Sequence, residues 1–298
     1  GGNPIYTQIP NAHFITEARY NGAKVITIAP DYSASAIHAD QWVPVKVATD
    51  AALGLSMAHV MIEEGIYNRR FVQEQTDLPL LVRSDNGRFL RRSEMEADGQ
   101  DDRFYVYDRA SGRVVLAPQD TLALGALDPA LDGEFEVEGR AGKIRVTPVF
   151  ARLRTHLRQY TPERATKICG VDPDTIRELA RQLAGARAAT CVCQSNLSKY
   201  YHAIEMERAQ LLCFALAGQM GRKGAGYLGF AYLSVDGVDG LAVAAGADDP
   251  KRILAGIGLQ MAPLVQENLA KGYTAEMSLY DLARKSYGQG SMAATMLW

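Results

Sequence analysis

The sequence predicts an α/β protein with parallel strands and a β-hairpin insertion, and three observations support this prediction. Short apolar runs at residues 25–29, 42–46 and 189–194 alternate with longer segments of helical periodicity. The run at 25–29 holds no charge and lies between a glycine turn and a proline, which is typical of a strand buried on both faces of a parallel sheet. Period-two patterns between residues 100 and 147 interrupt the alternation, so we also expect a β-hairpin insertion there.

A loop and a helix precede the first predicted strand. The chain begins with two glycines, which would let the backbone approach a phosphate or a ribose closely. A plain turn explains the same residues, because Gly-Gly and Asn-Pro are turn dipeptides. Pro10 suits the first turn of a helix, and Asn21-Gly22 suits its end.

Two predicted strands end next to acidic residues. The strand at 25–29 stops before Asp31, and the strand at 42–46 leads to Asp50 at the start of a helix, for which Thr49 is a natural N-cap. Ligands of open α/β sheets bind outside the carboxyl ends of the strands, so this layout is that of a nucleotide site. An ordinary α/β unit would use the same acids as helix caps, and both interpretations are open at this point.

The α/β pattern resumes at about residue 148, after the insertion, and Asp172-Pro173 is typical of the start of a helix in it. The strand at 189–194 is followed by Ser195, Asn196 and further hydrogen-bonding side chains as far as His202. An apolar helix then leads to a glycine-rich loop at 218–226, which holds two adjacent cations. Such a loop suits a phosphate, although glycine-rich loops also simply end helices.

Composition restricts the classes of function. A net charge of −2, with 47% hydrophobic and 22% charged residues, is typical of a globular protein without a basic surface for nucleic acid or an anionic membrane. No run is apolar and long enough to insert into a bilayer. The four cysteines and five histidines lack metal-ligand spacing, so we expect buried thiols and no complete metal site.

Five segments of the chain occur in a fixed order and together resemble one family. They are GGNPIYTQIPNAHFITEARYNGAKVITIAPDYSASAIHAD, TDAALGLSMAHVMIEEG, EQTDLPLLVR, SNLSKYYH and LAGQMGRKGAG. The chain resembles the molybdopterin oxidoreductases of the dimethyl-sulfoxide-reductase superfamily. The similar branch, type II, holds the catalytic alpha subunits of respiratory nitrate, selenate and chlorate reductases and of dimethylsulfide and ethylbenzene dehydrogenases.

The resemblance implies a fold and a cofactor. Two Rossmann-like lobes hold two molybdopterin guanine dinucleotides (the bis-molybdopterin guanine dinucleotide cofactor) and one molybdenum atom in this family. We therefore expect part of the first lobe at 1–83, a β-rich insertion at 84–147, part of the second lobe at 148–230 and a mixed C-terminal segment at 231–298. The molybdenum ligand and the cysteines of an iron–sulfur cluster would lie upstream, so we expect an internal fragment that is inactive alone.

The resemblance also implies the residues that bind the dinucleotide. By this analogy the carboxylate of Asp50 accepts hydrogen bonds from the N–H edge of guanine, which adenine lacks, while Thr49 supports it and Asp31 lies near the nucleoside. Ala48 stands where the family usually has glycine, so a left-handed backbone there would be strained. The full set expected to bind the cofactor is Gly2, Asn3, Asp31, Thr49, Asp50, Ser195, Asn196 and Gly221.

The reaction implied is the two-electron transfer of an oxygen atom between molybdenum and a small-molecule substrate. We expect reduction of an oxyanion of the nitrate, selenate or chlorate type, because more of the branch does that. The alternative is water-dependent hydroxylation of a hydrocarbon or a steroid side chain. Lys199 is the candidate cation beside an oxyanion, and His202 is the candidate proton relay. Alternatively, both residues only hydrogen-bond the pterin or pack the loop.

Partners, location and rival functions complete the expectations. The family implies an iron–sulfur electron-transfer subunit, in some members a haem subunit, and a periplasmic or cytoplasmic, membrane-associated location. One rival is a nicotinamide-dependent dehydrogenase, but residues 221–226 carry Gly-x-x-Gly-x-Gly at a helix end, which is the wrong context for a dinucleotide fingerprint. The other rival, a non-catalytic nucleotide-binding or assembly subunit, is left open by the sequence alone.

Overall fold

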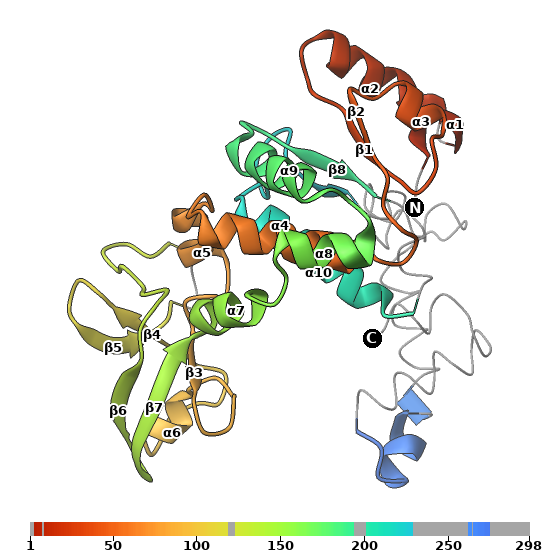
Figure 1. Ribbon diagram of the computed structural model, residues 1–298. Helices are drawn as coiled ribbons and strands as arrows, with labels where there is room; N and C mark the ends of the chain where they lie inside the picture. Colours follow the sequence, from red (N-terminus) through yellow and green to blue (C-terminus); the bar gives the residue numbers. More distant parts are fainter. Residues whose placement is uncertain are drawn as a thin grey trace. The chain divides into compact units, whose positions relative to one another are not determined.

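The computed structural model describes residues 3–7, 9–118, 123–193, 201–228, 262–263 and 265–274 (Figure 1). Contacts within the chain group Gly1–Leu228 into one compact unit and Gly229–Trp298 into a second. The described part of the second unit contains a short helical stretch at residues 265–270. All the named strands and helices belong to the first unit.

The N-terminal region is a small α/β unit built around one parallel strand pair. Its elements are α1 (Pro4–Thr7), α2 (Ile9–Tyr20), β1 (Ile26–Ile28), α3 (Ala34–Ile37) and β2 (Gln41–Val43). β1 and β2 run parallel, with Ile26 opposite Gln41 and Ile28 opposite Val43, as predicted. The expectation that β1 is buried on both faces is wrong, because β2 is the sole strand paired with it in the described chain and Ile28 is exposed.

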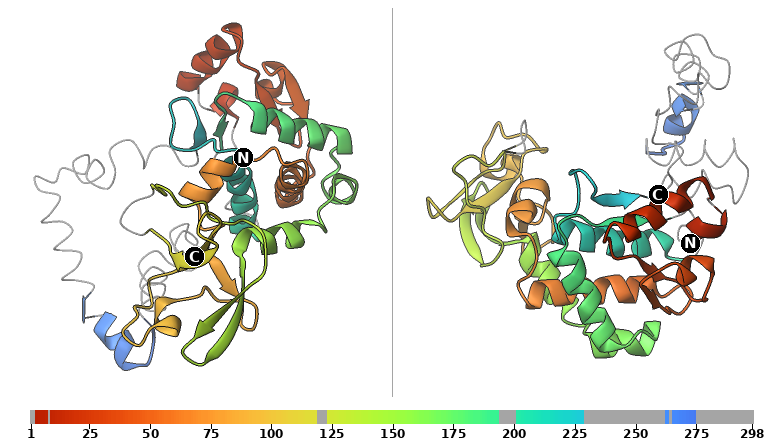
Figure 2. Two further views of the ribbon diagram at one scale, coloured as in Figure 1. Left: turned by 90° about the vertical axis from the view of Figure 1, so that its left-hand side faces the viewer. Right: turned by 90° about the horizontal axis from the view of Figure 1, so that it is seen from above.

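A group of helices around α4 forms the larger hydrophobic core. These helices are α4 (Asp50–Glu63), α5 (Arg69–Gln75), α7 (Val149–Leu157), α8 (Pro162–Cys169), α9 (Pro173–Gly185) and α10 (Ala203–Leu216). α4 contacts α7, α8, α9 and α10 (Figure 2). β8 (Thr190–Val192) pairs in parallel with β9 (Gly226–Leu228), which confirms the predicted parallel strand at 189–194. The buried side chains at the centre of this core include Val43, Met61, Val72, Phe150, Leu157, Ile176 and Leu216.

Helices α4 and α10 pack side by side and run in the same direction. A Cβ atom on Gly54 would lie 3.0 Å from the carbonyl carbon of Ala209, and the Cys213 thiol donates to the Gly54 carbonyl oxygen at 3.0 Å. At the other end, the backbone N–H of Asn68, just beyond α4, donates to the Leu216 carbonyl oxygen at 2.7 Å. The two helices therefore begin at the same end of the molecule.

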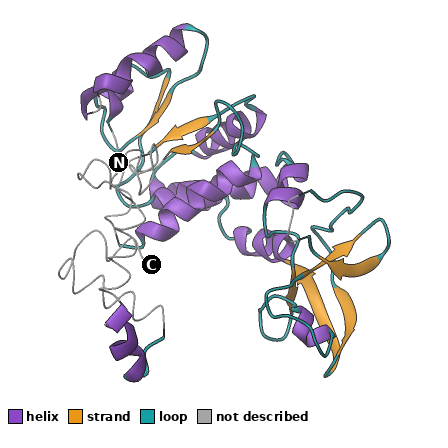
Figure 3. Ribbon diagram, turned by 180° about the vertical axis from the view of Figure 1, so that it is seen from behind, coloured by secondary structure: helices purple, strands orange, loops and turns teal. Residues whose placement is uncertain are grey.

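The predicted β-hairpin insertion is confirmed and has a core of its own. Its elements are β3 (Leu81–Arg83), α6 (Arg92–Met95), β4 (Tyr105–Asp108), β5 (Arg113–Leu116), β6 (Phe135–Gly139) and β7 (Gly142–Pro148). The hairpins β4–β5 and β6–β7 are antiparallel, and β3 pairs with β7 (Figure 3). Tyr107 stacks on Phe135 with ring centroids 3.7 Å apart, which joins the two hairpins. The buried residues of this second core are Leu81, Leu90, Tyr105, Ile144 and Val146.

Candidate functional site

Asp50 is the first residue of α4, and its carboxylate is half-buried. Burial raises the pKa of this carboxyl above its usual value of 3.8, and the Asp50 backbone N–H opposes that shift only in part. The described residues offer it no ion-pair partner. A desolvated carboxylate at a helix N-terminus is an acceptor suited to a ligand that donates hydrogen bonds.

The turn before Asp50 leaves the start of α4 open. Thr49 occupies the N-cap position as predicted, but its hydroxyl donates to the Lys46 carbonyl oxygen at 2.6 Å and makes no cap hydrogen bond. The expectation that the Thr49 side chain caps α4 is therefore wrong. Ala48 has φ +61°, so the left-handed turn that the sequence raised as a concern is present.

Asn3 and Asp31 lie at the carboxyl end of β1. The Asn3 side-chain oxygen accepts a hydrogen bond from the Ser35 hydroxyl at 2.5 Å, and Ser35 is buried. The Thr27 hydroxyl of β1 donates to the Ser35 carbonyl oxygen at 3.0 Å. Asp31 is exposed in the bend that follows β1. Ser35 thus ties the N-terminal segment to this strand end, a role that no sequence motif indicated. Gly2 lies outside the described residues.

His202 occupies the N-cap position of α10 with a left-handed backbone, at φ +58° and ψ +33°. Its side chain is 63% exposed, and its Nδ1 atom is 3.8 Å from a carboxylate oxygen of Glu205. With 1.5 Å of rise per residue, Asp50 lies about 6 Å before Gly54 along α4, and His202 lies about 10 Å before Ala209 along α10. The parallel packing therefore brings Asp50 and His202 to the same end. Lys199, Ser195 and Asn196 fall outside the described residues.

Gly221 lies at the opposite end of α10. It follows Leu216, the last residue of that helix, so roughly 20 Å of helix separates this end from His202. A Cβ atom on Gly221 would have open space around it, although its φ of +71° suits glycine. The structure therefore does not bring Gly221 together with Asp50. Its assignment to the dinucleotide stays a prediction.

The glycine-rich loop is held by a buried glutamine. The side-chain oxygen of Gln219 accepts from the Ala189 backbone N–H at 3.0 Å and from the Arg222 guanidinium at 2.8 Å. Its amide nitrogen donates to the Ala186 carbonyl oxygen at 2.7 Å, and the side chain is fully buried. A Cβ atom on Gly218 would lie 2.6 Å from the Asn68 side chain. Some of the glycines in this loop are therefore explained by helix termination and close packing, without a phosphate.

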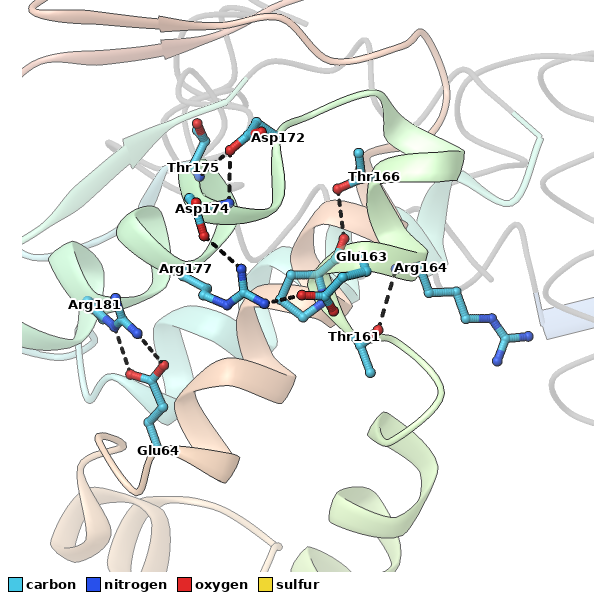
Figure 4. A network of polar contacts seen from close by, with 11 residues as sticks. Glu64, Thr161, Glu163, Arg164, Thr166, Asp172, Asp174, Thr175, Arg177 and Arg181 are labelled. Carbon is cyan, nitrogen blue, oxygen red and sulfur yellow. Dashed lines mark hydrogen bonds and ion pairs between the residues drawn. The ribbon is translucent and has the colours of Figure 1, made fainter.

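Ion pairs join α9 to α8 and to the end of α4 (Figure 4). Arg181 of α9 makes a bidentate contact with Glu64 at the end of α4, at 2.7 and 2.8 Å, and this hydrogen bonding lowers the pKa of Glu64. Arg177 pairs with Glu163 of α8 and with Asp174. These exposed contacts arrange the scaffold and touch none of the expected site residues.

The described residues contain no group of three histidine, cysteine or acidic side chains placed to hold a metal ion. None of the helices described has the length and apolar character that crossing a membrane requires.

Comparison with known proteins gives consistent results. The family described as molybdopterin oxidoreductase matches residues 1–280. The chain is 43% identical over 228 residues to the dimethylsulfide dehydrogenase subunit alpha of Rhodovulum sulfidophilum, covering 74% of this chain and 25% of that protein. It is also 43% identical over 228 residues to the chlorate reductase subunit alpha of Ideonella dechloratans, covering 74% and 24%.

A third relative is the perchlorate reductase subunit alpha of Dechloromonas aromatica, 40% identical over 253 residues, with 76% of this chain and 27% of that protein covered. The chain thus spans about a quarter of the length of the curated relatives it matches. Among solved structures, the acetylene hydratase of Pelobacter acetylenicus superposes with a TM-score of 0.41 at 18% identity, over 73% of this chain and 20% of that one.

Proposed function

Because this chain belongs to the molybdopterin oxidoreductase family, we propose that it is part of the catalytic subunit of a molybdenum enzyme and that it binds molybdopterin guanine dinucleotide. The observation that carries this proposal is Asp50. Its half-buried carboxylate lies at the start of α4, beside a Thr49 hydroxyl that is turned away to the Lys46 carbonyl.

The residues present fit the guanine end of such a cofactor. Guanine presents adjacent ring and amino N–H donors, and an ionised carboxylate can accept both. Asp50 offers two such acceptors, and the raised pKa of its carboxyl indicates a desolvated site in which a donated hydrogen bond is worth more. Asn3, Thr49 and Asp31 would line the same side of the ligand. This fit favours guanine recognition over the nicotinamide-dependent alternative.

We propose reduction of an oxyanion as the reaction of the whole subunit. Two of the three relatives described above are by name chlorate and perchlorate reductases. When bound, the molybdenum cofactor would supply the two-electron transfer of an oxygen atom. In this chain Asp50 would bind and orient the nucleotide end of the cofactor, and Lys199 would place a cation beside the anionic substrate. The third relative is by name a dehydrogenase, which keeps oxidation or hydroxylation of an organic substrate as the second candidate.

Partners and location extend the same proposal. The three relatives are each named as a subunit alpha, which is consistent with further subunits. We propose an iron–sulfur electron-transfer subunit, with a haem subunit as a further member, and a periplasmic complex. The iron–sulfur cluster of the catalytic subunit itself would be held by residues outside this chain.

The cofactor assignment is tested in the full-length subunit that contains this chain. Purified wild type should carry molybdenum and guanine nucleotide, and Asp50→Ala should weaken retention of both by about 1–3 kcal/mol, because a charged hydrogen-bond pair is lost. Asp77→Ala, at an exposed acid outside the site, is the control. Unchanged molybdenum and nucleotide contents in Asp50→Ala would count against the assignment.

The direction of the reaction needs a separate assay. The complete enzyme is offered a reduced dye with nitrate, selenate or chlorate, and an oxidised acceptor with ethylbenzene or a sterol. We expect turnover in the first assay and a large loss in Lys199→Ala. Turnover in the second assay alone would reverse the proposed direction, and unchanged kinetics in Lys199→Ala would remove that residue from the mechanism.

A further inference from the structure

We infer that His202 serves the proposed cofactor site as a positioning residue, through its left-handed backbone and not through its imidazole. The inference rests on the proposed function, because the site it positions is the end of the molecule that holds Asp50. The backbone dihedrals of His202, and not its side chain, then decide which residues can replace it.

His202 has a backbone conformation that is uncommon for residues other than glycine. Among the described residues other than glycine, Ala48 and His202 alone have positive φ, at +61° and +58°. The left-handed region is accessible to glycine and, among the other residues, is enriched several-fold in Asn, Asp and His, whereas β-branched residues are strongly disfavoured there. Histidine is thus one of the few residue types that can hold this backbone without glycine.

The left-handed backbone of His202 leaves the start of α10 without a side-chain cap. An N-cap side chain reaches the first-turn N–H groups from an extended backbone. Asn68, Thr161 and Asp172 have extended backbones at this position, and each accepts such a hydrogen bond. His202 is left-handed and makes none. Its carbonyl oxygen still accepts from the Met206 N–H at 3.2 Å, so α10 begins regularly behind an uncapped end.

The start of α10 lies at the same end of the helix pair as the start of α4. The contact of Gly54 with Ala209 fixes the register of α4 against α10, because Gly54 has no side chain to hold the two backbones apart there. Both helices begin at the same end, and each is preceded by a left-handed residue, Ala48 for α4 and His202 for α10. A change of backbone at position 202 would therefore disturb the start of α10, at the end of the helix pair that also holds Asp50.

The imidazole of His202 contacts residues that are near it in the chain. The ring is largely exposed, lies edge-on to Tyr201 with centroids 4.0 Å apart, and faces Glu205 of its own helix at 3.8 Å. Tyr201 is itself 88% exposed. These contacts are local to the helix start, so the ring is not what joins α10 to α4.

The test compares His202→Asn, His202→Gly, His202→Ala and His202→Val in the full-length subunit. Asn and Gly accept the left-handed backbone without an imidazole, whereas Ala accepts it less well and Val least. We expect Asn and Gly to keep the molybdenum and guanine nucleotide contents and the pH profile of wild type. We expect Val to lose roughly tenfold in cofactor content and to unfold at a lower temperature. Ala, which packs without a branched side chain, should fall between them.

The control is Glu205→Gln, which removes the charged neighbour of the ring and leaves the backbone unchanged. It should behave as wild type. Loss of cofactor, or a shifted pH profile, in Asn and Gly as large as in Val would show that the imidazole acts and would overturn the inference. A Val variant indistinguishable from wild type would overturn it as well. If wild type itself carries no molybdenum or guanine nucleotide, the proposed function fails, while the order of the unfolding midpoints still tests the backbone role.

Discussion

At the scale of single residues, strain and burial are concentrated just before and at the start of α4. Ala48 has a backbone that favours glycine, and Asp50 has a carboxyl whose pKa is raised by burial. Neither feature stabilises the chain by itself. Both are consistent with a site whose geometry is kept for a ligand.

Replacing Ala48 by glycine should stabilise the protein. The left-handed conformation costs an L-residue about 1–2 kcal/mol, part of which is offset by the greater freedom of glycine in the unfolded chain, so we expect a gain of about 1 kcal/mol. Ala51→Gly, inside α4, is the matched control and should lose about 1 kcal/mol. Chemical denaturation of the two variants measures both values. A loss of stability in Ala48→Gly would contradict the dihedral assignment.

Replacing Asp50 by asparagine should raise stability near neutral pH when no ligand is bound. The carboxyl has a higher pKa in the folded protein than in the unfolded chain, so its contribution is most favourable at low pH and is lost as pH rises through the folded pKa. The ionised group is therefore unfavourable at pH 7, and asparagine avoids that cost. Thermal unfolding should show a higher midpoint for Asp50→Asn at pH 7, with the difference shrinking below about pH 4. Equal midpoints at pH 7 would argue against desolvation as the cause.

These residue-scale features differ in how far the sequence reveals them. The resemblance to the family raised the possibility of a left-handed turn at Ala48, and Asp50 follows from its position after a strand. Ser35 could not be predicted, because a buried serine that binds Asn3 depends on two segments about thirty residues apart. The uncapped start of α10 could not be predicted from the sequence either, because histidine is typical of neither a helix cap nor a turn.

At the scale of elements, the approach of α4 to α10 controls the geometry of the site. The two backbones come close at Gly54, where an added Cβ atom would lie 3.0 Å from the Ala209 carbonyl carbon and 3.1 Å from its oxygen. Backbone atoms cannot swing away as the end of a side chain can. Any enlargement there must move one helix against the other.

Gly54→Ala should therefore destabilise the protein by about 1–3 kcal/mol, despite the better helix propensity of alanine. Gly185→Ala provides the control, because an added Cβ atom at the end of α9 meets nothing within 4 Å. Circular dichroism during thermal unfolding would compare the pair. A Gly54→Ala variant as stable as Gly185→Ala would mean that the helices are not in close contact.

The signals at element starts explain which helices the sequence revealed. Asp172-Pro173 predicts the start of α9, and the Asp172 carboxylate accepts from the backbone N–H groups of Asp174 and Thr175. The same signal at Thr161-Pro162 starts α8, which we did not predict. Helix α8 has eight residues, which are too few turns for a helical period of apolar residues to be recognised. The capping residues were therefore the sole sequence feature from which α8 could have been predicted.

At the scale of the whole molecule, the first unit has two hydrophobic cores. The larger is built from the helices, and the smaller belongs to the insertion. The chain leaves for the insertion along β3 and returns along β7, and these strands are antiparallel neighbours with Arg83 opposite Val146. A short turn can therefore join the points where the insertion begins and ends.

Replacing residues 85–144 by a short glycine–asparagine turn should leave the cofactor site intact. The insertion contains none of the expected cofactor-binding residues, and it has a core of its own, although its Leu131 is buried in the core around α4. The full-length subunit with this replacement should retain molybdenum and guanine nucleotide, with a somewhat lower unfolding temperature because β3 and β7 lose neighbours. Loss of the cofactor from a folded variant would show that the insertion contributes to the site.

The thiol of Cys213 lies in the contact between α4 and α10, so its reactivity depends on that contact. It is 2% exposed, it donates to the Gly54 carbonyl oxygen, and burial raises its pKa to about 12. At neutral pH the sulfur is therefore protonated and screened, so an alkylating reagent can reach it only while the helices are apart. The rate at which Cys213 is alkylated then measures how often the two helices separate, and any ligand that joins their N-terminal ends would slow that rate.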